Sequence, residues 1–268
     1  MRTTNNNRVI LTSVPKAGTY LGAEILQAMG FTATHLHIRH DANITGVYNF
    51  KNKPVTMSHA EELECFSSMP LENSLGMIGK GEFAVGHIPP LPEVKNMLCK
   101  NFKVVFLARN LRDCLISHMR YMIKTEALSV TDHPWIKIPN KQDLFKNYLI
   151  NYAESVGPLV HMKLISCWEF DIYTPYPNME LFKLRFEDII SSEKEVRRTT
   201  LNALASFLEV RSPLPTDKLL NQVLGKQTMT RSDGLTVAQE YWSPYAEKWF
   251  TDRISTNGVN INKFIGYK

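Results

Sequence analysis

The segment from Arg8 to Gly30 constrains the fold of this chain more than any other feature. Residues 9–14 read Val-Ile-Leu-Thr-Ser-Val, a continuous β-prone run of the kind that forms a strand buried in a parallel sheet. Pro15 and Gly18 end that run, and residues 20–29 then carry apolar side chains at helical spacing. We therefore predict a strand, a short loop and a helix, the first unit of an α/β sheet.

The same alternation continues along the chain. The predicted strands are 83–87, 103–109 and 179–186, and the predicted helices are 91–100, 110–124 and 193–208. Strands that alternate with helices at this spacing imply right-handed crossovers. We expect an α/β fold with a mostly parallel central sheet flanked by helices.

We predict one domain over residues 1–268, because the sequence contains no internal repeat and no low-complexity linker. Residues 31–81 and 125–140 depart from the α/β rhythm and are rich in Pro, His and polar residues, so we expect irregular inserts there. Long loops of this kind often bind substrate. Residues 141–168 are predicted to be helical and to cover an edge of the sheet.

Charge and cysteine usage narrow the class of protein. The net charge of +5 suits an anionic ligand, but it is spread too thinly to indicate nucleic acid, and ordinary solubility explains it equally well. The four cysteines stand far apart, which argues against a disulfide framework or a structural zinc site. The polar N-terminus has no signal-peptide core, and no apolar run reaches the length of a membrane span. We expect a cytoplasmic protein.

The loop at residues 15–19, Pro-Lys-Ala-Gly-Thr, has the features of an anion site. Gly18 lets backbone N–H groups turn toward an anion, the helix start adds its dipole, and Lys16 and Thr19 add a charge and a hydroxyl. A nucleotide kinase P-loop instead needs Lys and Ser/Thr after its last glycine, whereas Lys16 precedes Gly18. A plain turn with a surface lysine is the alternative.

Two further strand ends carry candidate site residues. Arg109 closes one predicted strand, at the edge where open α/β sheets bind ligands, and Ser117 follows two helical turns later. Arg109 could grip a phosphate while Ser117 bonds another oxygen; Arg112 and Asp113 are explained as helix-start charges. His87 closes another strand, where a neutral imidazole could take a proton from a hydroxyl; a structural role is the alternative.

Together these motifs resemble those of the sulfotransferases that use 3′-phosphoadenylyl sulfate (PAPS). Residues 15–19 are similar to the family's 5′-phosphosulfate loop, PKxGT, and Arg109 with Ser117 to its 3′-phosphate pair. His87, in a Gly-His-x-Pro setting, falls where cytosolic-type members carry their base. Residues 186–188, Phe-Glu-Asp, are similar to the Tyr-Glu-Asp segment whose aromatic ring lies near the adenine. The resemblance covers nearly the whole chain.

The resemblance implies a single sulfotransferase domain of P-loop-like architecture. Its implied reaction is in-line transfer of a sulfuryl group from PAPS to an acceptor hydroxyl or amine, with PAP as product and no metal. His87 would be the base, and Lys16 would stabilise the leaving phosphosulfate oxygen. The residues that it assigns to cofactor binding are Lys16, Ala17, Gly18, Thr19, Tyr20, Arg109, Ser117, Phe186 and Arg231.

The sequence departs from the family pattern at several positions. Leu21 stands where many members carry the adenine-stacking tryptophan, so the adenine must be held differently. Val85 replaces a lysine before the histidine, and Arg231 is what remains of a C-terminal phosphate-binding segment. Some members use a carboxylate base, for which Glu82 is the nearby candidate.

Two other functions stay open, a P-loop nucleotide kinase and a non-catalytic PAP-binding protein of the same fold. The expected acceptor is a small molecule, a glycan or a lipid, and no nucleic acid partner is expected. Thr236, Val237 and Glu240 match the family's short dimerisation motif, which suggests a homodimer. His35, His37 and His40 are interpreted as lining an acceptor pocket, since no Cys or carboxylate pattern supports a metal site.

Overall fold

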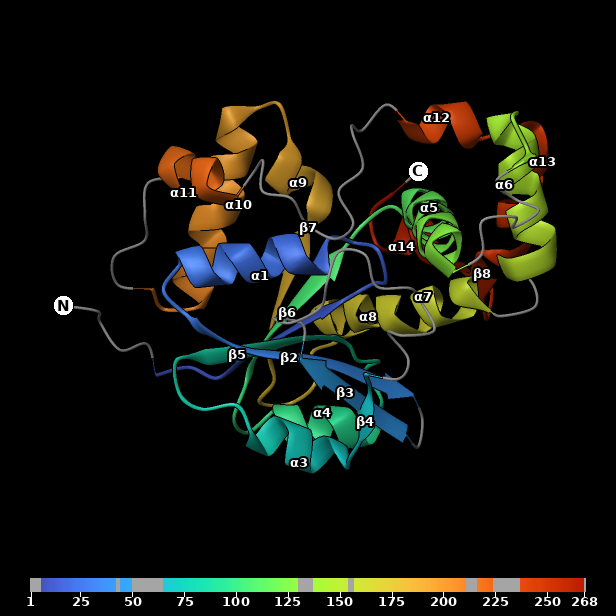
Figure 1. Cartoon of the computed structure of the whole chain (residues 1–268). Helices are drawn as coiled ribbons and strands as arrows, with labels where there is room; N and C mark the ends of the chain where they lie inside the picture. The colour runs from blue at the N-terminus through green and yellow to red at the C-terminus, as the bar shows by residue number, and fades with distance from the viewer. Residues whose placement is uncertain are drawn as a thin grey trace.

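A seven-stranded sheet forms the centre of the chain (Figure 1). The computed structural model describes residues 6–41, 44–49, 65–129, 137–153, 157–210, 216–223 and 237–267. The strand order is β4-β3-β2-β5-β1-β6-β7. The strands are β1 (Val9–Ser13), β2 (Thr32–Asp41), β3 (Ile44–Asn49), β4 (Ser67–Ser68), β5 (Glu82–His87), β6 (Lys103–Ala108) and β7 (Glu180–Arg185).

Four of the strand pairings are parallel: β2 with β5, β5 with β1, β1 with β6, and β6 with β7. The pairs β2–β3 and β3–β4 at one edge are antiparallel. All residues of β1 and β6 are buried, as expected for parallel strands covered on both faces. The prediction of a mostly parallel central sheet flanked by helices is confirmed.

Helices cover both faces of this sheet and extend beyond one side of it (Figure 1). The helices before β7 are α1 (Thr19–Ala28), α3 (Leu71–Gly76), α4 (Pro92–Leu98), α5 (Leu111–Ser129), α6 (Lys141–Tyr148), the π-helix η3 (Leu149–Ala153), α7 (Pro158–Ser166) and α8 (Trp168–Tyr173). The remainder are α9 (Phe186–Ile190), α10 (Lys194–Phe207), α11 (Thr216–Val223), α12 (Val237–Tyr241), α13 (Pro244–Arg253) and α14 (Ile261–Phe264), with a small hairpin of β8 (Ser255–Thr256) and β9 (Val259–Asn260).

Three sets of helices define the layers around the sheet. α1 contacts β1 and β5 and packs beside α11, while α10 packs against β7. α3 and α4 lie on the opposite side of the sheet in Figure 1. α5, α6, α12 and α13 form a separate group, in which α6 contacts α5, α12 and α13. The helices predicted at 20–29, 91–100, 110–124 and 193–208 are therefore present, and 141–168 is largely helical as expected.

The prediction of an irregular insert over residues 31–81 is wrong where the structure describes it. Residues 32–41 and 44–49 form β2 and β3, and 71–76 form α3. The alternation of apolar and polar residues that marks a strand is missing from β2, because β2 is rich in polar residues. Its pairing with β5 also shifts register between Ala33 and His37. His35 lies inside that irregularity with φ 60°. Similarly, α5 continues to Ser129 into the stretch predicted as irregular from residue 125.

Gly86 shows how closely β2 and β5 approach each other. A Cβ on Gly86 would lie 2.1 Å from the carbonyl oxygen of Ile38, its register partner on β2. Only glycine therefore allows this parallel pairing, and the pairing fixes the end of β5, where His87 lies.

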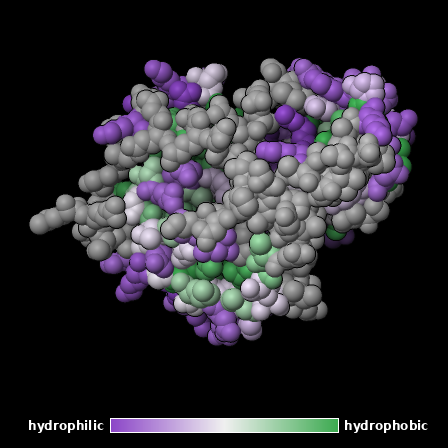
Figure 2. All heavy atoms as spheres, in the orientation of Figure 1, coloured by the Kyte–Doolittle hydropathy of each residue, from purple (hydrophilic) through white to green (hydrophobic). Residues whose placement is uncertain are grey.

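The outer helices present polar surface to solvent. Figure 2 shows hydrophilic residues over the region of α6 and α13, at the upper right of that view. In α6, Lys141, Gln142 and Lys146 are exposed, whereas Phe145 and Tyr148 are fully buried. Within the described segments, no helix combines the length and the apolar character needed to cross a membrane.

Candidate functional site

The predicted site residues come together at the carboxyl end of the parallel strands. β1, β5, β6 and β7 pair in parallel, so their carboxyl ends share one edge of the sheet. The loop 14–18 follows β1, His87 ends β5, Arg109 follows β6 and Phe186 follows β7. This is the edge at which open α/β sheets bind their ligands.

The loop after β1 has backbone geometry suited to an anion. Lys16 and Gly18 both have left-handed φ angles, 67° and 97°. Gly18 is the N-cap of α1, and no side-chain hydrogen bond caps this helix start. The first N–H groups of a helix have no partners within the helix, and together with the helix dipole they attract anions. The start of α1 therefore offers donors to a ligand.

Phe186 and Arg109 close one side of this loop. A Cβ on Gly18 would lie 2.7 Å from Cδ2 of Phe186, so the aromatic ring packs directly on the glycine. The guanidinium carbon of Arg109 lies 4.3 Å from the centroid of the same ring. The loop, the ring and the guanidinium thus form one packed unit from β1, β7 and β6.

Arg109 has one buried donor left for a ligand. Its Nη1 donates to the carbonyl oxygen of Lys16 at 3.0 Å. Its Nε is buried and has no hydrogen-bond partner among the described residues. A buried donor without a partner costs free energy unless a bound group accepts from it. Ser117 is half-buried two turns into α5.

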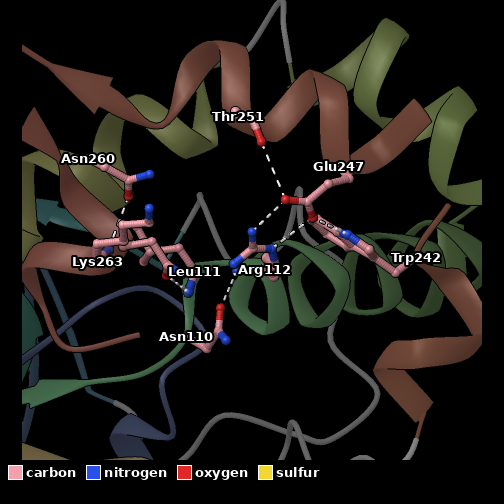
Figure 3. A network of polar contacts seen from close by, with 9 residues as sticks. Asn110, Leu111, Arg112, Trp242, Glu247, Thr251, Asn260 and Lys263 are labelled. Atoms are coloured by element: carbon pink, nitrogen blue, oxygen red, sulfur yellow. Dashed lines mark hydrogen bonds and ion pairs between the residues drawn. The ribbon is translucent and has the colours of Figure 1, made fainter. Parts of the chain in front are cut away.

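The start of α5 differs from that of α1, because its amides are already used. The amide of Asn110 donates to Oε1 of Glu187 at 3.2 Å. The amide of Leu111 donates to Oδ1 of Asn262 at 3.0 Å, and that of Arg112 to Oδ1 of Asn110 at 3.0 Å (Figure 3). These contacts leave α1 as the better helix start for an anion.

Sequence reasoning missed the roles of Glu187 and Asn262. Glu187 also accepts from the hydroxyl of Tyr267 at 2.5 Å, so the end of the chain helps to fix the junctions after β6 and β7. Glu187 stood in the recognised Phe-Glu-Asp segment, but Asn262 lies 151 positions from Leu111 and carried no sequence signal.

Arg112, which the sequence analysis explained as a helix-start charge, forms an ion pair within the fold. Its guanidinium forms an ion pair with Glu247 of α13 at 2.7 Å (Figure 3). Glu247 also accepts from Nε1 of Trp242 and from the hydroxyl of Thr251. These bonds from Arg112 hold the pKa of the Glu247 carboxyl below its ordinary value. The neighbouring Asp113 has a raised pKa because burial disfavours its charged form.

Ser13 connects His87 to the anion loop. Nδ1 of His87 lies 2.8 Å from the carbonyl oxygen of Ser13, which can only accept, so Nδ1 carries the proton. The hydroxyl of Ser13 lies 2.6 Å from that of Thr19, at the start of α1. The neutral ring then presents an unprotonated Nε2, the form that a general base requires.

The surroundings of His87 favour this neutral form. Its pKa is lowered well below 6.5, first by burial and second by the nearby His37. The His37 ring is edge-on to His87, with a centroid separation of 4.9 Å. The hydroxyl of Tyr20 lies 3.3 Å from Nδ1 of His37, so Tyr20 faces β2. Cofactor binding by Tyr20 stays a prediction.

Four other residues that the sequence analysis named remain to be placed. Ala17 is fully buried and its amide donates to the carbonyl oxygen of Val14 at 2.9 Å, so it shapes the loop from inside. Glu82 begins β5, at the opposite edge of the sheet from His87, and accepts from the amide of Gly79. The interpretation of Glu82 as a nearby alternative base is therefore wrong. Arg231 and Thr236 lie outside the described residues.

No group of three His, Cys, Asp or Glu side chains in the described segments could hold a metal ion. Within the histidine-rich stretch, His40 pairs with Thr45, and His37 with Tyr20. Glu240, from the stretch that resembles a dimerisation motif, forms an ion pair with Lys141 of the same chain.

Comparisons with known proteins identify the fold and the family of this chain. The structure is similar to that of mouse sulfotransferase SULT7A1 complexed with PAP, with a TM-score of 0.52 and 13% identity, covering 97% of this chain and 88% of that chain. It is also similar to retinol dehydratase in a complex with retinol and PAP, with a TM-score of 0.50 and 14% identity, covering 96% and 84%. A search of curated protein sequences finds no match. The family model of the sulfotransferase domain matches residues 6–228, and the chain therefore belongs to the sulfotransferase domain family.

Proposed function

We propose that this protein transfers a sulfuryl group from PAPS to an acceptor hydroxyl or amine and releases PAP. The observation that carries the proposal is the double contact of Ser13, whose carbonyl oxygen binds His87 while its hydroxyl binds Thr19. That contact puts a neutral imidazole beside an anion loop at one edge of the sheet. Transfer of an anionic group to a nucleophile needs both the base, His87, and the loop that holds the anion.

The binding of PAPS is argued from the start of α1 and from Arg109. The uncapped start of α1, with Thr19 as its first residue, suits the 5′-phosphosulfate. The buried Nε of Arg109, which has no partner among the described residues, suits a phosphate oxygen, together with Ser117. Phe186 and Tyr20 are the candidate neighbours of the adenine. Two solved structures of similar fold hold PAP, which supports this choice of donor.

His87 acts as the general base in this account. The acceptor's O–H or N–H proton passes to Nε2 of His87 as the new bond to sulfur forms. The bond between sulfur and the 5′-phosphate oxygen breaks at the same time, and PAP leaves with the negative charge. Nδ1–H of His87, held by the Ser13 carbonyl, keeps the ring oriented during this proton transfer.

Lys16 supplies the charge that the leaving group needs. Its backbone conformation is fixed by a positive φ and by the bond from Arg109 to its carbonyl oxygen. A positioned ammonium group stabilises an oxygen most where charge develops in the transition state. The chain thus meets the electrostatic demand of the reaction with its own cations and helix dipole.

The acceptor is proposed more broadly, as a small molecule, a glycan or a lipid. One solved structure of similar fold holds retinol and PAP, which fits a small organic acceptor. His37 lies beside His87 and the hydroxyl of Tyr20 lies 3.3 Å from Nδ1 of His37, so polar groups border the reacting position.

The test is transfer of ³⁵S from labelled PAPS to a panel of phenols, lipid alcohols, glycosides and amines. The proposal predicts labelled product and an equal amount of PAP with one class. His87→Asn should lower the transfer rate by at least about 100-fold, because a general base contributes 10²–10⁴-fold, while PAP affinity changes little.

Glu82→Gln is the matched control, because Glu82 lies at the other end of the same strand. Its transfer rate should equal that of the unmodified protein. Unchanged turnover in His87→Asn, or a large loss in Glu82→Gln, would show that the base is assigned wrongly. Tight PAP binding with no transfer to any acceptor would favour a non-catalytic PAP-binding protein.

A further inference from the structure

Tyr121 of α5 lies beside the lysine of the anion loop. The ammonium nitrogen of Lys16 is 3.9 Å from the centroid of the Tyr121 ring. Ser117 precedes Tyr121 by four positions on α5, so both side chains lie on the same face of the helix. That face turns toward the loop, since the Lys16 ammonium contacts the Tyr121 ring.

We propose that Tyr121 is a positioning residue that holds the Lys16 ammonium over the donor site through a cation–π contact. This inference rests on the proposed sulfuryl transfer and adds a residue that no motif in the sequence singled out. Tyr121 touches neither reacting atom in this account. It acts only through Lys16.

The physical need for such a residue comes from the lysine side chain. A lysine ammonium is a compact charge on a flexible four-carbon stem, so a fixed backbone does not fix the charge. A cation over an aromatic face within about 6 Å is attracted by the ring, by roughly 0.5–2 kcal/mol depending on solvent exposure. The half-buried ring of Tyr121 restricts where the ammonium can be when charge develops on the leaving oxygen.

The contact itself can be tested without any cofactor. A tyrosine ring shifts the NMR signals of protons above its face upfield, so the Lys16 methylene next to the ammonium should resonate upfield in the unmodified protein. Tyr121→Phe keeps the aromatic face and should keep that shift, whereas Tyr121→Leu should lose it. An ordinary lysine shift in the unmodified protein, or an unchanged shift in Tyr121→Leu, would overturn the contact.

The consequence for catalysis is tested by kinetics with labelled PAPS. Tyr121→Leu should lower kcat by about two- to thirtyfold, the range that corresponds to a cation–π contact, with a smaller change in KM for PAPS. Tyr121→Phe should recover most of the loss. Tyr173→Leu removes an exposed tyrosine on α8 and controls for loss of an aromatic residue as such.

The outcomes separate this inference from the proposed function. Loss of the methylene shift with unchanged kcat in Tyr121→Leu overturns the positioning role. Equal loss of kcat in the Phe and Leu variants assigns the effect to the tyrosine hydroxyl and also overturns it. If the unmodified protein neither binds PAP nor transfers sulfate, the proposed function fails, while the NMR result still decides whether the contact exists.

Discussion

Nδ1 of His87 donates a hydrogen bond of 2.8 Å to the carbonyl oxygen of Ser13, the last residue of β1. The two residues lie 74 positions apart and meet because β1 and β5 pair in parallel, Thr12 opposite Gly86. This bond fixes the tautomer of His87, and the Ser13 hydroxyl continues it to Thr19. The candidate base and the candidate anion loop are therefore one connected structure.

The lowered pKa of His87 predicts an unusual pH dependence of its protonation. Burial and the neighbouring His37 oppose protonation, so the midpoint of His87 protonation should lie below pH 6.5. In a plot of kcat against pH, the fall in kcat on the acid side should therefore also occur below pH 6.5. An NMR titration of the His87 ring checks the same value directly; a midpoint at or above 6.5 would contradict the account.

The same shift predicts a loss of stability in acid. Below pH 6.5 the unfolded chain binds the His87 proton more readily than the folded chain, so the free energy of unfolding falls as pH drops toward the folded pKa. His87→Asn removes this component. Urea unfolding of both proteins between pH 7.5 and 5.5 should give a steeper decline for the unmodified protein, and parallel curves would contradict the prediction.

Gly18→Ala should disrupt the anion loop. The new Cβ would meet the Phe186 ring at 2.7 Å, in a residue whose φ is already +97°. Gly30→Ala is the matched control, because Gly30 has the same φ of +97° but nothing within 4 Å of a Cβ. Gly30→Ala should cost about 1 kcal/mol of stability for the backbone alone, and Gly18→Ala about 1–3 kcal/mol more from the clash. Urea unfolding measures the loss of stability in each variant. Equal losses in the two variants would show that the Phe186 ring moves aside at no cost in free energy.

Arg109→Ala should weaken PAP binding, because it removes the buried Nε and the bond to the Lys16 carbonyl. Charge-assisted hydrogen bonds contribute about 1.5–3 kcal/mol, which corresponds to roughly 10- to 150-fold in Kd. Arg109→Lys should not rescue binding, since an ammonium lacks the planar fork. In calorimetric titrations, Arg112→Gln should leave the Kd for PAP unchanged, because Arg112 pairs with Glu247. Full rescue by lysine would argue against this role of Arg109.

Tyr267→Phe should destabilise the protein by about 1.5–3 kcal/mol, because it removes the donor to the Glu187 carboxylate. Tyr176→Phe removes a tyrosine hydroxyl that bonds the Asn96 side chain at the surface, and should cost less than about 0.5 kcal/mol. Urea unfolding distinguishes the two. Equal losses in the free energy of unfolding would mean that the bond from Tyr267 to Glu187 does not stabilise the junctions after β6 and β7.

The sequence predicted the parts of the fold whose signals are local. The sequence shows directly the apolar runs of β1, β5 and β6, the glycine before α1, and the positions of His87 and Arg109 at strand ends. β2 was missed because its polar histidines and its bulge break the alternation that marks a strand. Contacts such as Ser13 with His87 and Lys16 with Tyr121 depend on which strands and helices become neighbours, and that information is not local.

Binding of PAP tests the central claim most directly. Isothermal titration calorimetry should show that PAP binds the unmodified protein, that AMP, which lacks the 3′-phosphate, binds at least about tenfold more weakly, and that ATP with Mg²⁺ gives no comparable heat. A tenfold difference corresponds to about 1.4 kcal/mol, the scale of one charge-assisted contact from Arg109 or Ser117. Tight binding of ATP with Mg²⁺ and no binding of PAP would contradict the account and favour a nucleotide kinase.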